Sequence, residues 1–441
     1  MSDEILEELE ANGYKTYLVG GCVRDEILRR KNYDIDITSQ AKPCEIKKIF
    51  KDYKLIDIGA KFGTIKVIKD GKEYEITTMR KESSYKDNRH PDEIEFSDDI
   101  YEDLKRRDFT INAMAKRNNE IIDPFDGKRD INLKVIRAVG DAYDRINEDM
   151  LRALRAVRFA TTLDFKIEDD LKKAIRNNSR SILDISKERI QVEINKILLS
   201  NNPSRGIKLL DEVGLLEYIF PELYRTKGFD QHSTFHSEDV YNHSLTVLAK
   251  TPPILKVRMA ALYHDVGKLD TFFLDEKGEG RFFGHQNLSQ DLLINRLKDL
   301  KYSNKFIEES SILVKRHMDN TNTYTKKSIR KLLRNIGEDN TLNLFALQRA
   351  DVLATNYADD SNINLGIKLL EEVKKDDVPN RRSQIKIDGN DLKKLGFKEG
   401  KELGDTLRKI ENLIYDEKLK NNKKDIINYI NSRLKNVDWV I

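Results

Sequence analysis

Two aspartates separated by one residue, Asp34 and Asp36, lie in a short apolar segment, Tyr33–Thr38, that has the composition of a strand. Side chains two positions apart on a strand share one face, so the carboxylates form a pair while Ile35 and Ile37 point to the other side. Paired carboxylates are ligands that hard divalent cations such as Mg²⁺ prefer. Ions held there could activate an attacking hydroxyl group and stabilise a leaving pyrophosphate. In isolation, the pair also fits a solvated strand face.

A Gly-Gly pair and an arginine stand just before these carboxylates. Gly20-Gly21 follows the apolar strand Tyr17–Val19 and opens a helix-like run that carries Arg24. Glycine lets the backbone approach a phosphate closely enough for its amides to donate hydrogen bonds. A guanidinium group one helical turn later would add a bidentate phosphate contact. The spacing therefore predicts a phosphate-binding turn next to the carboxylate pair.

A third group of polar residues suits the edges of nucleobases. The helical pattern around Glu148–Phe159 places Glu148, Arg152 and Arg155 on one face, with Asp149 at its border. A carboxylate accepts a hydrogen bond from an exocyclic amine, and a guanidinium group donates one to a ring nitrogen. Cytosine and adenine offer an amine beside an unprotonated ring nitrogen, whereas uracil and guanine reverse that polarity. An Asp/Arg pair here would therefore select C and A; a solvated face with salt bridges is the alternative.

The histidines are concentrated in the second half of the chain. Of the 7 histidines, only His90 comes before the segment that carries the others. His243, the dipeptide His264-Asp265 and the distant Asp351 lie in segments with a helical, apolar pattern. Imidazoles and carboxylates from different helices can converge on one divalent ion. This order predicts a second metal site and hence two chemistries in one chain.

Composition limits the classes of protein that this chain can belong to. Its 441 residues predict about three domains of roughly 150 residues each. The 79 Lys and Arg residues nearly cancel the 76 Asp and Glu residues, which excludes a general polycation but not a local basic groove. Its 2 cysteines cannot build a disulfide framework. The acidic N-terminus is no signal peptide, and no apolar run reaches roughly 18 residues. We therefore expect a cytoplasmic protein that contacts no membrane.

Periodicity indicates which elements position these groups. The pattern predicts helices over 3–14 and 142–199, strands over 64–69 and 72–78, and, near the C-terminus, a strand-like or turn segment over 385–395 followed by helices over 404–416 and 424–434. Asp70-Gly71 between the two strands is a dipeptide typical of hairpins. Residues 80–98 are polar and predict a long mobile loop.

The motifs of the first half occur in an order that is typical of a known family. GGCVRD at Gly20–Asp25, followed by Asp34–Asp36, resembles the nucleotidyltransferase signature of the polymerase-β superfamily. The later motifs are Asp103–Ala115 (DLKRRDFTINAMA), Asp123–Gly127 (DPFDG), Glu148–Arg152 (EDMLR) and Ser186–Arg189 (SKER). This set resembles class II tRNA nucleotidyltransferases, which comprise the CCA-adding enzymes and their bacterial poly(A) polymerase relatives. The resemblance covers the first half of the chain.

The resemblance implies a role for each matching residue. Asp34 and Asp36 would be catalytic and hold Mg²⁺, and Glu75 is either a third metal-site carboxylate or a strand-face residue. Asp149 and Arg152 would select the base. The other residues expected to bind the nucleotide are Gly21, Arg24, Arg107, Arg155 and Arg158. In CCA-adding relatives a flexible loop at the position of 80–98 helps to switch selection from C to A, so its presence favours complete CCA addition.

The second half resembles the HD phosphohydrolase superfamily. Four residues match its metal-ligand positions: His243, His264, Asp265 and Asp351. His285 and His317 fit where some members hold a second ion, and His236 is either a neighbour of the site or a helix cap. The resemblance implies a divalent transition metal (Mn, Ni, Co or Fe) and a second, phosphohydrolase activity. The alternative is a structural body without a relevant substrate.

The predicted fold class is α+β, with a polymerase-β-type nucleotidyltransferase head (mixed sheet with helices) followed by an elongated all-α neck, an HD-type body and a tail. The expected boundaries are 1–138 for the head, 139–228 for the neck, 229–375 for the HD-type domain and 376–441 for the tail. The expected function is addition of CMP and AMP from CTP and ATP to the 3′ end of tRNA, whose acceptor stem the body and tail would grip. The alternatives are a poly(A) polymerase or A-adding enzyme, and an HD phosphohydrolase with a nucleotide-binding head. The sequence indicates no oligomeric state.

Overall fold

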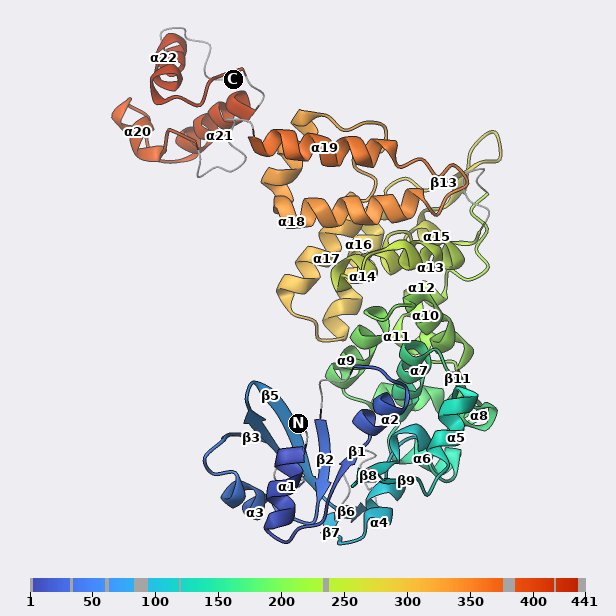
Figure 1. Ribbon diagram of the computed structural model, residues 1–441. Helices are drawn as coiled ribbons and strands as arrows, with labels where there is room; N and C mark the ends of the chain where they lie inside the picture. The colour runs from blue at the N-terminus through green and yellow to red at the C-terminus, as the bar shows by residue number, and fades with distance from the viewer. Residues whose placement is uncertain are drawn as a thin grey trace. The chain divides into compact units, whose positions relative to one another are not determined.

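The computed structural model describes residues 3–31, 35–59, 63–82, 94–118, 120–232, 238–375, 385–415 and 418–434. The chain forms two compact units, Met1–Pro221 and Glu222–Ile441. The first contains a mixed sheet and helices, and the second is mainly helical (Figure 1). The predicted α+β fold class is confirmed. Among the described residues, none of the helices combines the length and the apolar character that a bilayer crossing requires.

The first unit is built on a seven-stranded sheet with the order β3-β4-β5-β2-β1-β8-β9. Its strands are β1 (Thr16–Val19), β2 (Ile35–Ser39), β3 (Lys54–Gly59), β4 (Thr64–Lys69), β5 (Lys72–Thr78), β8 (Ala115–Arg117) and β9 (Glu120–Ile122). β2 and β5 run parallel, and the other neighbouring strands run antiparallel. The parallel pair therefore brings two strands with acidic residues side by side.

The hairpin of β4 and β5 has the bounds that the sequence predicts. Asp70 and Gly71 connect the strands with φ angles of 50° and 74°, and Lys69 pairs with Lys72 across the turn. Two central residues with positive φ form a type I′ turn, whose twist matches that of the flanking strands. A glycine at the second position adopts this conformation without steric cost.

Helices α1 (Asp3–Ala11) and α3 (Pro43–Ile49) cover one face of this sheet (Figure 1). The buried apolar residues between them and the strands are Ile5, Leu9, Ile37, Ala41, Ile46, Phe50, Ile65, Val67, Tyr74 and Ile76. Each buried Ile, Leu or Phe side chain contributes roughly 1.5–3 kcal/mol. Helix α1 ends before the predicted residue 14, because Gly13 adopts a left-handed φ of 88° that closes the helix.

The predicted long loop over 80–98 is shorter than expected. Its two ends form strands β6 (Arg80–Glu82) and β7 (Ile94–Phe96), which pair antiparallel. Arg80 pairs with Phe96, so the pairing of β6 with β7 begins two residues after the end of β5 at Thr78. Residues 83–93 lie outside the described residues.

The rest of the first unit is largely helical. Its helices are α2 (Gly21–Ile27), α4 (Ile100–Lys105), α5 (Gly127–Leu133), α6 (Ala142–Glu148), α7 (Leu151–Leu163), α8 (Asp169–Asn178), α9 (Lys187–Leu198), α10 (Pro203–Glu212) and α11 (Leu216–Ile219), with 3₁₀ turns at Thr110–Asn112 and Ser179–Asp184 and a short helix α12 (Pro221–Tyr224) at the boundary. The small strands β10 (Val135–Ile136) and β11 (Lys166–Ile167) pair in parallel.

The prediction of continuous helix over 142–199 is wrong, and so is the single helix around Glu148–Phe159. The chain is extended at Asp149, with φ −155° and ψ 105°, so α6 and α7 are separate helices. The Asp149 carboxylate accepts a hydrogen bond from the Leu151 amide at 3.0 Å. Such a local bond offers the backbone an alternative to helix and starts a new one. A second break follows Asp164, which takes a left-handed φ of 59°.

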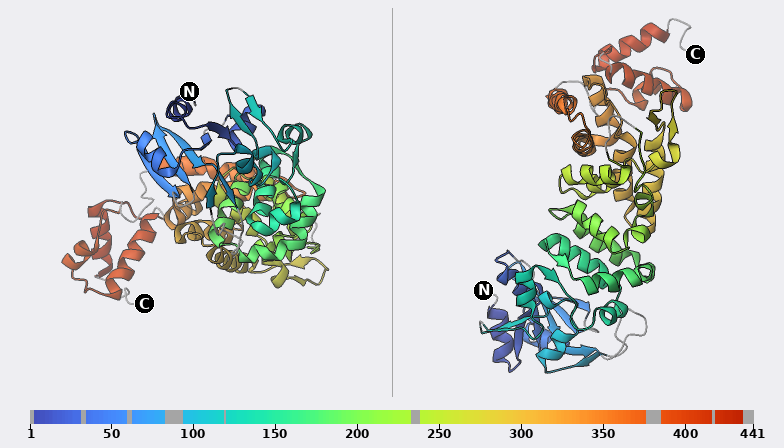
Figure 2. Two further views of the ribbon diagram at one scale, coloured as in Figure 1. Left: turned by 90° about the horizontal axis from the view of Figure 1, so that it is seen from below. Right: turned by 90° about the vertical axis from the view of Figure 1, so that its right-hand side faces the viewer.

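In its described residues, the second unit contains a group of packed helices and one small hairpin. Its helices are α13 (Val240–Lys250), α14 (Leu255–Tyr263), α15 (Lys268–Thr271), α16 (His285–Asp299), α17 (Asn304–Arg316), α18 (Lys326–Val352) and α19 (Ser361–Lys375), and the hairpin strands are β12 (Phe273–Leu274) and β13 (Gly280–Arg281). Helices α18 and α19 lie side by side (Figures 1 and 2). Within α18, Gly337 has a non-helical φ of 77° that marks a kink.

Three C-terminal helices have an apolar core of their own. They are α20 (Gly389–Lys394), α21 (Lys401–Tyr415) and α22 (Lys423–Leu434), and they enclose Ile387, Leu392, Ile410, Ile426 and Ile430. The predicted strand-like or turn segment over 385–395 is therefore wrong from Gly389 to Lys394, which form a helix. Asp388 accepts a hydrogen bond from the Asp391 amide at 2.9 Å, and this cap starts a helix at Gly389.

Candidate functional site

A cavity of about 720 Å³ lies within the first unit. Pockets for small ligands typically have volumes of about 300–1,000 Å³. Every described residue that the sequence predicted for nucleotide binding lines this cavity: Gly21, Arg24, Arg107, Asp149, Arg152, Arg155 and Arg158. Asp36 and Glu75 line it as well. The fold thus brings residues that are more than a hundred positions apart to one place. Asp34 lies outside the described residues.

Two carboxylates stand on the sheet side of the cavity. Asp36 on β2 is the register partner of Glu75 on β5, so the two side chains point to the same face of the sheet. The next residue, Ile37, is buried in the core under α1 and α3. Carboxylate oxygen atoms are the donors that a hard divalent cation takes. The described residues on this face therefore fit such an ion.

Gly20 separates the carboxylates from an arginine. It has a left-handed φ of 71°, and a Cβ atom there would lie 2.8 Å from Arg107 Nη1 and 3.6 Å from Asp36 Oδ2. Arg107 Nη2 donates to Asp103 Oδ2 at 3.3 Å, and Arg106 Nη2 donates to Asp103 Oδ1 at 2.7 Å. Burial opposes the charge on Asp103, but the two guanidinium groups hold the pKa of its carboxyl below the usual value. A larger residue at position 20 would displace Arg107.

Arg24 is held on the same side by two side chains. It is buried, with 8% of its surface exposed. Its Nη1 atom donates to Asn112 Oδ1 at 2.7 Å, and its Nε atom donates to Asp25 Oδ1 at 2.9 Å. Because these bonds fix the plane of the guanidinium group, Arg24 is oriented before a phosphate arrives.

The predicted base-selecting residues both have partners within the protein. Arg189 Nη2 donates to Asp149 Oδ2 at 2.6 Å. Arg152 Nη1 is paired with Glu148 and also donates to the Arg145 carbonyl at 2.9 Å. A carboxylate oxygen has more than one lone pair, so Asp149 can accept a further bond while Arg189 holds it. The arrangement orients an acceptor and a donor along one wall of the cavity.

Three arginines surround one aromatic ring beneath the cavity. The guanidinium carbons of Arg24, Arg155 and Arg158 lie 5.1, 5.4 and 3.9 Å from the centroid of the Phe159 ring. The face of an aromatic ring attracts such cations. Arg155 Nε donates to Asp108 Oδ2 at 2.6 Å, and Arg158 Nε donates to Glu193 Oε2 at 2.5 Å. Burial lowers the pKa of Arg158, and its repulsion from Arg155 contributes in the same direction. The result is a basic wall suited to a polyphosphate.

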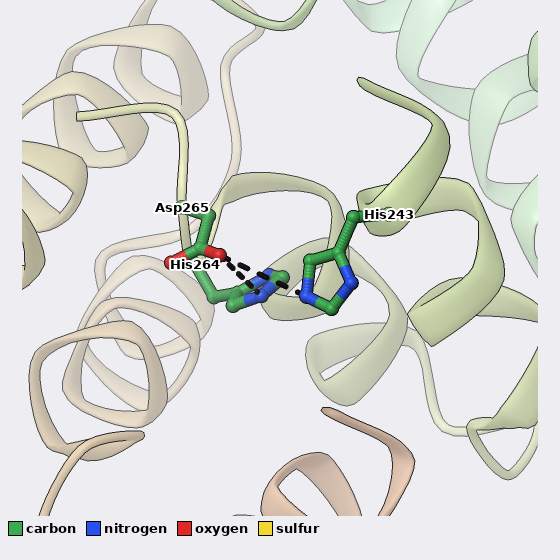
Figure 3. Close-up of side chains that lie close together, drawn as sticks. All are labelled: His243, His264 and Asp265. Carbon is green, nitrogen blue, oxygen red and sulfur yellow. Dashed lines mark ion pairs between the residues drawn. The ribbon is translucent and has the colours of Figure 1, made fainter. Parts of the chain in front are cut away.

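A second cluster of titratable residues lies in the second unit. His243 is on α13, His264 and Asp265 follow α14, and Asp351 is on α18. His243 Nε2 lies 3.0 Å from Asp351 Oδ1 and 3.8 Å from Asp265 Oδ2. His264 Nε2 lies 3.2 Å from Asp265 Oδ2 and 3.6 Å from Asp351 Oδ1. Figure 3 shows both imidazole rings turned towards the Asp265 carboxylate. The predicted set of four residues therefore converges.

Two further histidines face the other oxygen of the same carboxylate. His285 Nε2 and His317 Nε2 lie 3.2 and 3.6 Å from Asp265 Oδ1, and 3.3 Å from each other. Asp265 thus presents one oxygen to each histidine pair. His236 lies outside the described residues. Groups of imidazoles that share a carboxylate are suited to divalent transition metals.

The tautomers of these histidines favour metal binding. The Nδ1 atoms of His264, His285 and His317 lie 2.8, 2.8 and 2.7 Å from backbone carbonyl oxygens, of Ala261, Phe282 and Val314 respectively. A carbonyl that accepts from Nδ1–H directs Nε2 into the cluster, where this atom can bind a metal ion once it has lost its proton. The buried Nε2 atom of His264 makes no hydrogen bond among the described residues. The donor set therefore fits a metal ion.

Lys268 and the surrounding charges complete this second cluster. Lys268 Nζ lies 2.7 Å from Asp265 Oδ2 and donates to Gln231 Oε1 at 2.8 Å. Burial opposes a charge on His264, but Asp265 and Asp351 raise the pKa of its imidazole to about 10. In the protein without a metal ion, these opposite charges hold the cluster together.

Some residues at the two sites were not singled out from the sequence. In the first unit they are Asp103, Asp108, Asn112, Arg189 and Glu193, and in the second they are Gln231 and Lys268. Most of those in the first unit lie within the DLKRRDFTINAMA and SKER segments, which carried a family resemblance but no role for these side chains. Apart from Asp103, which pairs with Arg106 and Arg107, each of them has a partner at least 35 positions away along the chain or, for Lys268 and Gln231, one 37 positions away; Arg24 and Asn112 are 88 apart. Local spacing alone therefore could not identify them.

Family models match three stretches of the chain. Residues 16–137 match "Poly A polymerase head domain", and residues 164–226 match "Probable RNA and SrmB- binding site of polymerase A". Residues 283–430 match the second domain of tRNA nucleotidyltransferase. The first match contains Asp36 and Arg107, and so covers the sheet side of the cavity.

The chain is similar to curated proteins along its whole length. It is 36% identical to a CCA-adding enzyme of Pediococcus pentosaceus over 97% of this chain and 96% of that protein. It is 34% identical to a CCA-adding enzyme of Streptococcus thermophilus over 97% and 95% of the two chains. The crystal structure of a Bacillus stearothermophilus CCA-adding enzyme in complex with CTP is 27% identical, has a TM-score of 0.75 and covers 98% of both chains. On these similarities, this chain belongs to the family of CCA-adding enzymes, the class II tRNA nucleotidyltransferases.

Proposed function

We propose that this protein adds CMP and AMP, taken from CTP and ATP, to the 3′ end of tRNA without a nucleic-acid template. The observation that carries the proposal is the placement of Asp149 and Arg152 in the same cavity as Asp36 and Glu75. One wall can select a base while another holds the reacting phosphate. Relatives over nearly the full length are named CCA-adding enzymes, and a similar solved structure holds CTP.

The residues predicted to bind the nucleotide would divide into base-selecting and triphosphate-binding groups. Asp149 would accept a hydrogen bond from the exocyclic amine of C or A, and Arg152 would donate one to the adjacent ring nitrogen. The triphosphate would contact Gly21, Arg24, Arg107, Arg155 and Arg158, all of which line the cavity. UTP and GTP would leave both selecting groups without matching partners, which penalises their binding.

Asp34 and Asp36 would hold Mg²⁺, with Glu75 available beside Asp36. When bound, the metal ion would lower the pKa of the 3′ hydroxyl group and neutralise charge on the triphosphate. Asp36 would hold the metal ion from β2. Because Gly20 has no side chain, the space between Asp36 and Arg107 stays free. The acid pair would supply the oxygen ligands that Mg²⁺ requires, and the basic wall would hold the triphosphate.

Nucleotide incorporation tests the proposal directly. The substrate is a tRNA that ends at the discriminator base, supplied with CTP, with ATP, or with both, and the products are separated at single-nucleotide resolution. We expect two C residues with CTP alone and a complete CCA end with both nucleotides. Failure to incorporate C would support the poly(A) polymerase or A-adding alternative instead.

We further propose a division into a head (1–138), a neck (139–228), an HD-type domain (229–375) and a tail (376–441). The body and tail would contact the acceptor stem of tRNA through its phosphates and shape, because the grooves of A-form RNA offer little sequence information to side chains. Reaction with tRNA, CTP and ATP would take place in the cytoplasm.

A second function is proposed for the His/Asp cluster, namely metal-dependent hydrolysis of a phosphomonoester or a 2′,3′-cyclic phosphodiester. The observation in its favour is Asp265, whose two oxygens each face a pair of histidines. A bound Mn²⁺, Ni²⁺, Co²⁺ or Fe²⁺ would activate water for attack on phosphorus. Lys268 holds the Asp265 carboxylate in place.

The test uses the full-length protein and compares Mn²⁺, Ni²⁺, Co²⁺ and Fe²⁺ in turn. We expect hydrolysis with at least one of these ions and its loss in His264→Ala. An absence of hydrolysis with all four would favour a structural role for the cluster, and would leave the proposal of CCA addition unaffected.

A further inference from the structure

Two phenylalanine side chains are exposed close to the His/Asp cluster. Phe273 lies on β12 and Phe283 follows β13, and 45% and 78% of their surfaces are accessible to solvent. Their ring centroids are 5.7 Å apart, at an interplanar angle of 42°. Leu274 beside them is 51% exposed. Grouped apolar residues at the surface of a folded protein mark a binding site more often than scattered ones do. We refer to Phe273 and Phe283 as the aromatic pair.

Phe283 is only two residues before His285, so the aromatic pair lies near the cluster. Consecutive Cα atoms are about 3.8 Å apart, so the Cα atoms of Phe283 and His285 cannot be more than about 7.6 Å apart. The carbonyl oxygen of Phe282, between them, lies 2.8 Å from His285 Nδ1. Lys268 Nζ lies 5.2 Å from the Phe282 ring centroid and 2.7 Å from Asp265 Oδ2. The hairpin is therefore adjacent to the shared carboxylate.

The neighbouring phenylalanines anchor the hairpin. The Phe272 ring lies 5.3 Å from the Phe229 ring, 5.7 Å from the Phe282 ring and 5.8 Å from the stacked His232 ring. In each of the two Phe-Phe dipeptides, the first ring is half-buried among these neighbours, whereas the second, Phe273 or Phe283, is exposed to solvent. The exposed rings are held on a supported surface.

The cluster side of this surface suits an anion. His285 is the first residue of α16, a helix of 15 residues. The positive end of the dipole of such a helix lies at its N-terminus and attracts negative charge. A phosphate near His285 would meet this end of α16, the metal ions proposed above, and Lys268.

We propose that the aromatic pair binds the nucleobase of a nucleoside phosphate whose phosphate group lies at the His/Asp cluster. The substrate class of the proposed phosphohydrolase would then be nucleotides rather than simple phosphoesters, and this inference rests on that proposed activity. Every base has an aromatic face, so stacking on Phe273 and Phe283 accepts all four bases. If the base is bound in this way, nucleotides with any of the four bases should bind, whereas a sugar phosphate without a base should bind more weakly.

A matched pair of substrates tests the inference. AMP and ribose 5-phosphate differ only in the base, and their hydrolysis by the full-length protein is measured with the most active metal ion. We expect Phe283→Ala and Phe273→Ala to raise KM for AMP about tenfold, which is about 1.4 kcal/mol, and to leave KM for ribose 5-phosphate within about twofold. Phe283→Trp should retain the wild-type KM for AMP, whereas Phe283→Leu, which keeps an apolar side chain, should behave like Phe283→Ala.

Leu365→Ala is the control for loss of an exposed apolar side chain, since Leu365 is 39% exposed on α19. It should leave both KM values unchanged. Metal content, measured by elemental analysis, should be the same in the wild type and all variants if the cluster is intact. Equal effects of Phe283→Ala on the two substrates would overturn the inference while leaving the phosphohydrolase proposal in place.

A binding measurement separates the inference from the activity. The fluorescence of 2-aminopurine riboside 5′-monophosphate is titrated with the wild type and with Phe283→Ala. Because the two proteins have the same nucleotide-binding cavity in the first unit, the difference between the curves reports on the aromatic pair. A binding phase that is lost in Phe283→Ala and retained in Phe283→Trp supports the aromatic pair even if no hydrolysis is found. Identical curves for the wild type and Phe283→Ala overturn it.

Discussion

At the scale of single residues, Asp36 is the residue of the central sheet that we expect to bind the catalytic metal ion. It lines the cavity beside Glu75, and its neighbour Ile37 belongs to the core. We expect Asp36→Ala to keep the fold and tRNA binding but to lower nucleotide addition by about 100-fold or more, because a metal ligand supports several kcal/mol of transition-state stabilisation. Single-turnover incorporation at saturating Mg²⁺ measures this effect. The exposed Asp52→Asn serves as a control, and near-normal incorporation by Asp36→Ala would contradict the assignment.

Arg189 illustrates a residue that acts through its neighbour. Its Nη2 atom donates to Asp149 Oδ2 at 2.6 Å, so it positions the carboxylate that we expect to select the base. Arg189→Met removes a charge-assisted hydrogen bond, which is worth about 1.5–3 kcal/mol. We therefore expect incorporation of C and A to become at least about tenfold less efficient, and relative misincorporation of UTP to rise.

Incorporation of all four nucleotides, each supplied alone, measures the effect of Arg189→Met. Arg189→Lys, which retains the charge, should recover part of the discrimination. An equal loss for all four nucleotides would show that Arg189 does not set base choice.

At the scale of elements, the break between α6 and α7 determines where the selecting residues lie. Asp149 is in the extended link and Arg152 is in the first turn of α7. Asp149→Ala combined with Arg152→Ala should relax base choice so that UTP and GTP are incorporated, because each unmatched buried polar group penalises the wrong base by roughly 1–3 kcal/mol. Incorporation of each nucleotide into tRNA measures the change. If the double variant slows incorporation of all four nucleotides equally, Asp149 and Arg152 do not select the base.

Helix α4 provides a test of stability against pH. Burial opposes the charge on Asp103, but Arg106 and Arg107 lower the pKa of its carboxyl in the folded protein. Its ion pairs therefore stabilise the fold fully above the unfolded pKa of about 4 and lose that contribution as the pH falls further, through the folded pKa. Asp103→Asn should reduce the apparent free energy of unfolding by about 3 kcal/mol at pH 7.

Urea unfolding of the wild type and Asp103→Asn between pH 7 and pH 3 measures this difference. We expect it to be constant near neutral pH and to shrink in acid. Asp170→Asn is a suitable control, since the Asp170 side chain is 71% exposed and pairs with the exposed Lys173 at 3.1 Å; its effect should be below about 0.5 kcal/mol. A difference that does not depend on pH would show that the charge of Asp103 is not responsible.

At the scale of the whole molecule, the two proposed sites draw their side chains from different units. Asp36 belongs to Met1–Pro221 and His264 to Glu222–Ile441. We expect His264→Ala to lower bound transition metal and hydrolysis while CCA addition stays within about twofold of the wild type, since a separate metal centre serves each reaction. Asp36→Ala should give the reverse pattern. Both activities and the metal content are measured on one preparation, and a parallel loss of both activities would indicate a folding defect instead.

Local patterns in the sequence determined much of this protein. The period-two alternation around Asp36 and Ile37 predicted that the two side chains point to opposite faces of the sheet, and Ile37 packs in the core, because pleating separates adjacent side chains. Asp70-Gly71 predicted the hairpin, because its turn needs two positive φ angles. The ordered motifs identified the family, which the full-length relatives confirm. The order of histidines and aspartates likewise predicted the four residues that converge in the second unit.

Only the tertiary structure decided which distant side chains are partners. Arg24 meets Asn112 across 88 positions, and Arg189 meets Asp149 across 40. Periodicity assigns a side chain to a face of its own element, but it does not specify which face of another element packs there. The break at Asp149 also escaped prediction, because its side-chain bond to the Leu151 amide competes with a helix that the apolar spacing favours. In the same way, only the packing of separate helices gives each oxygen of Asp265 its own pair of histidines.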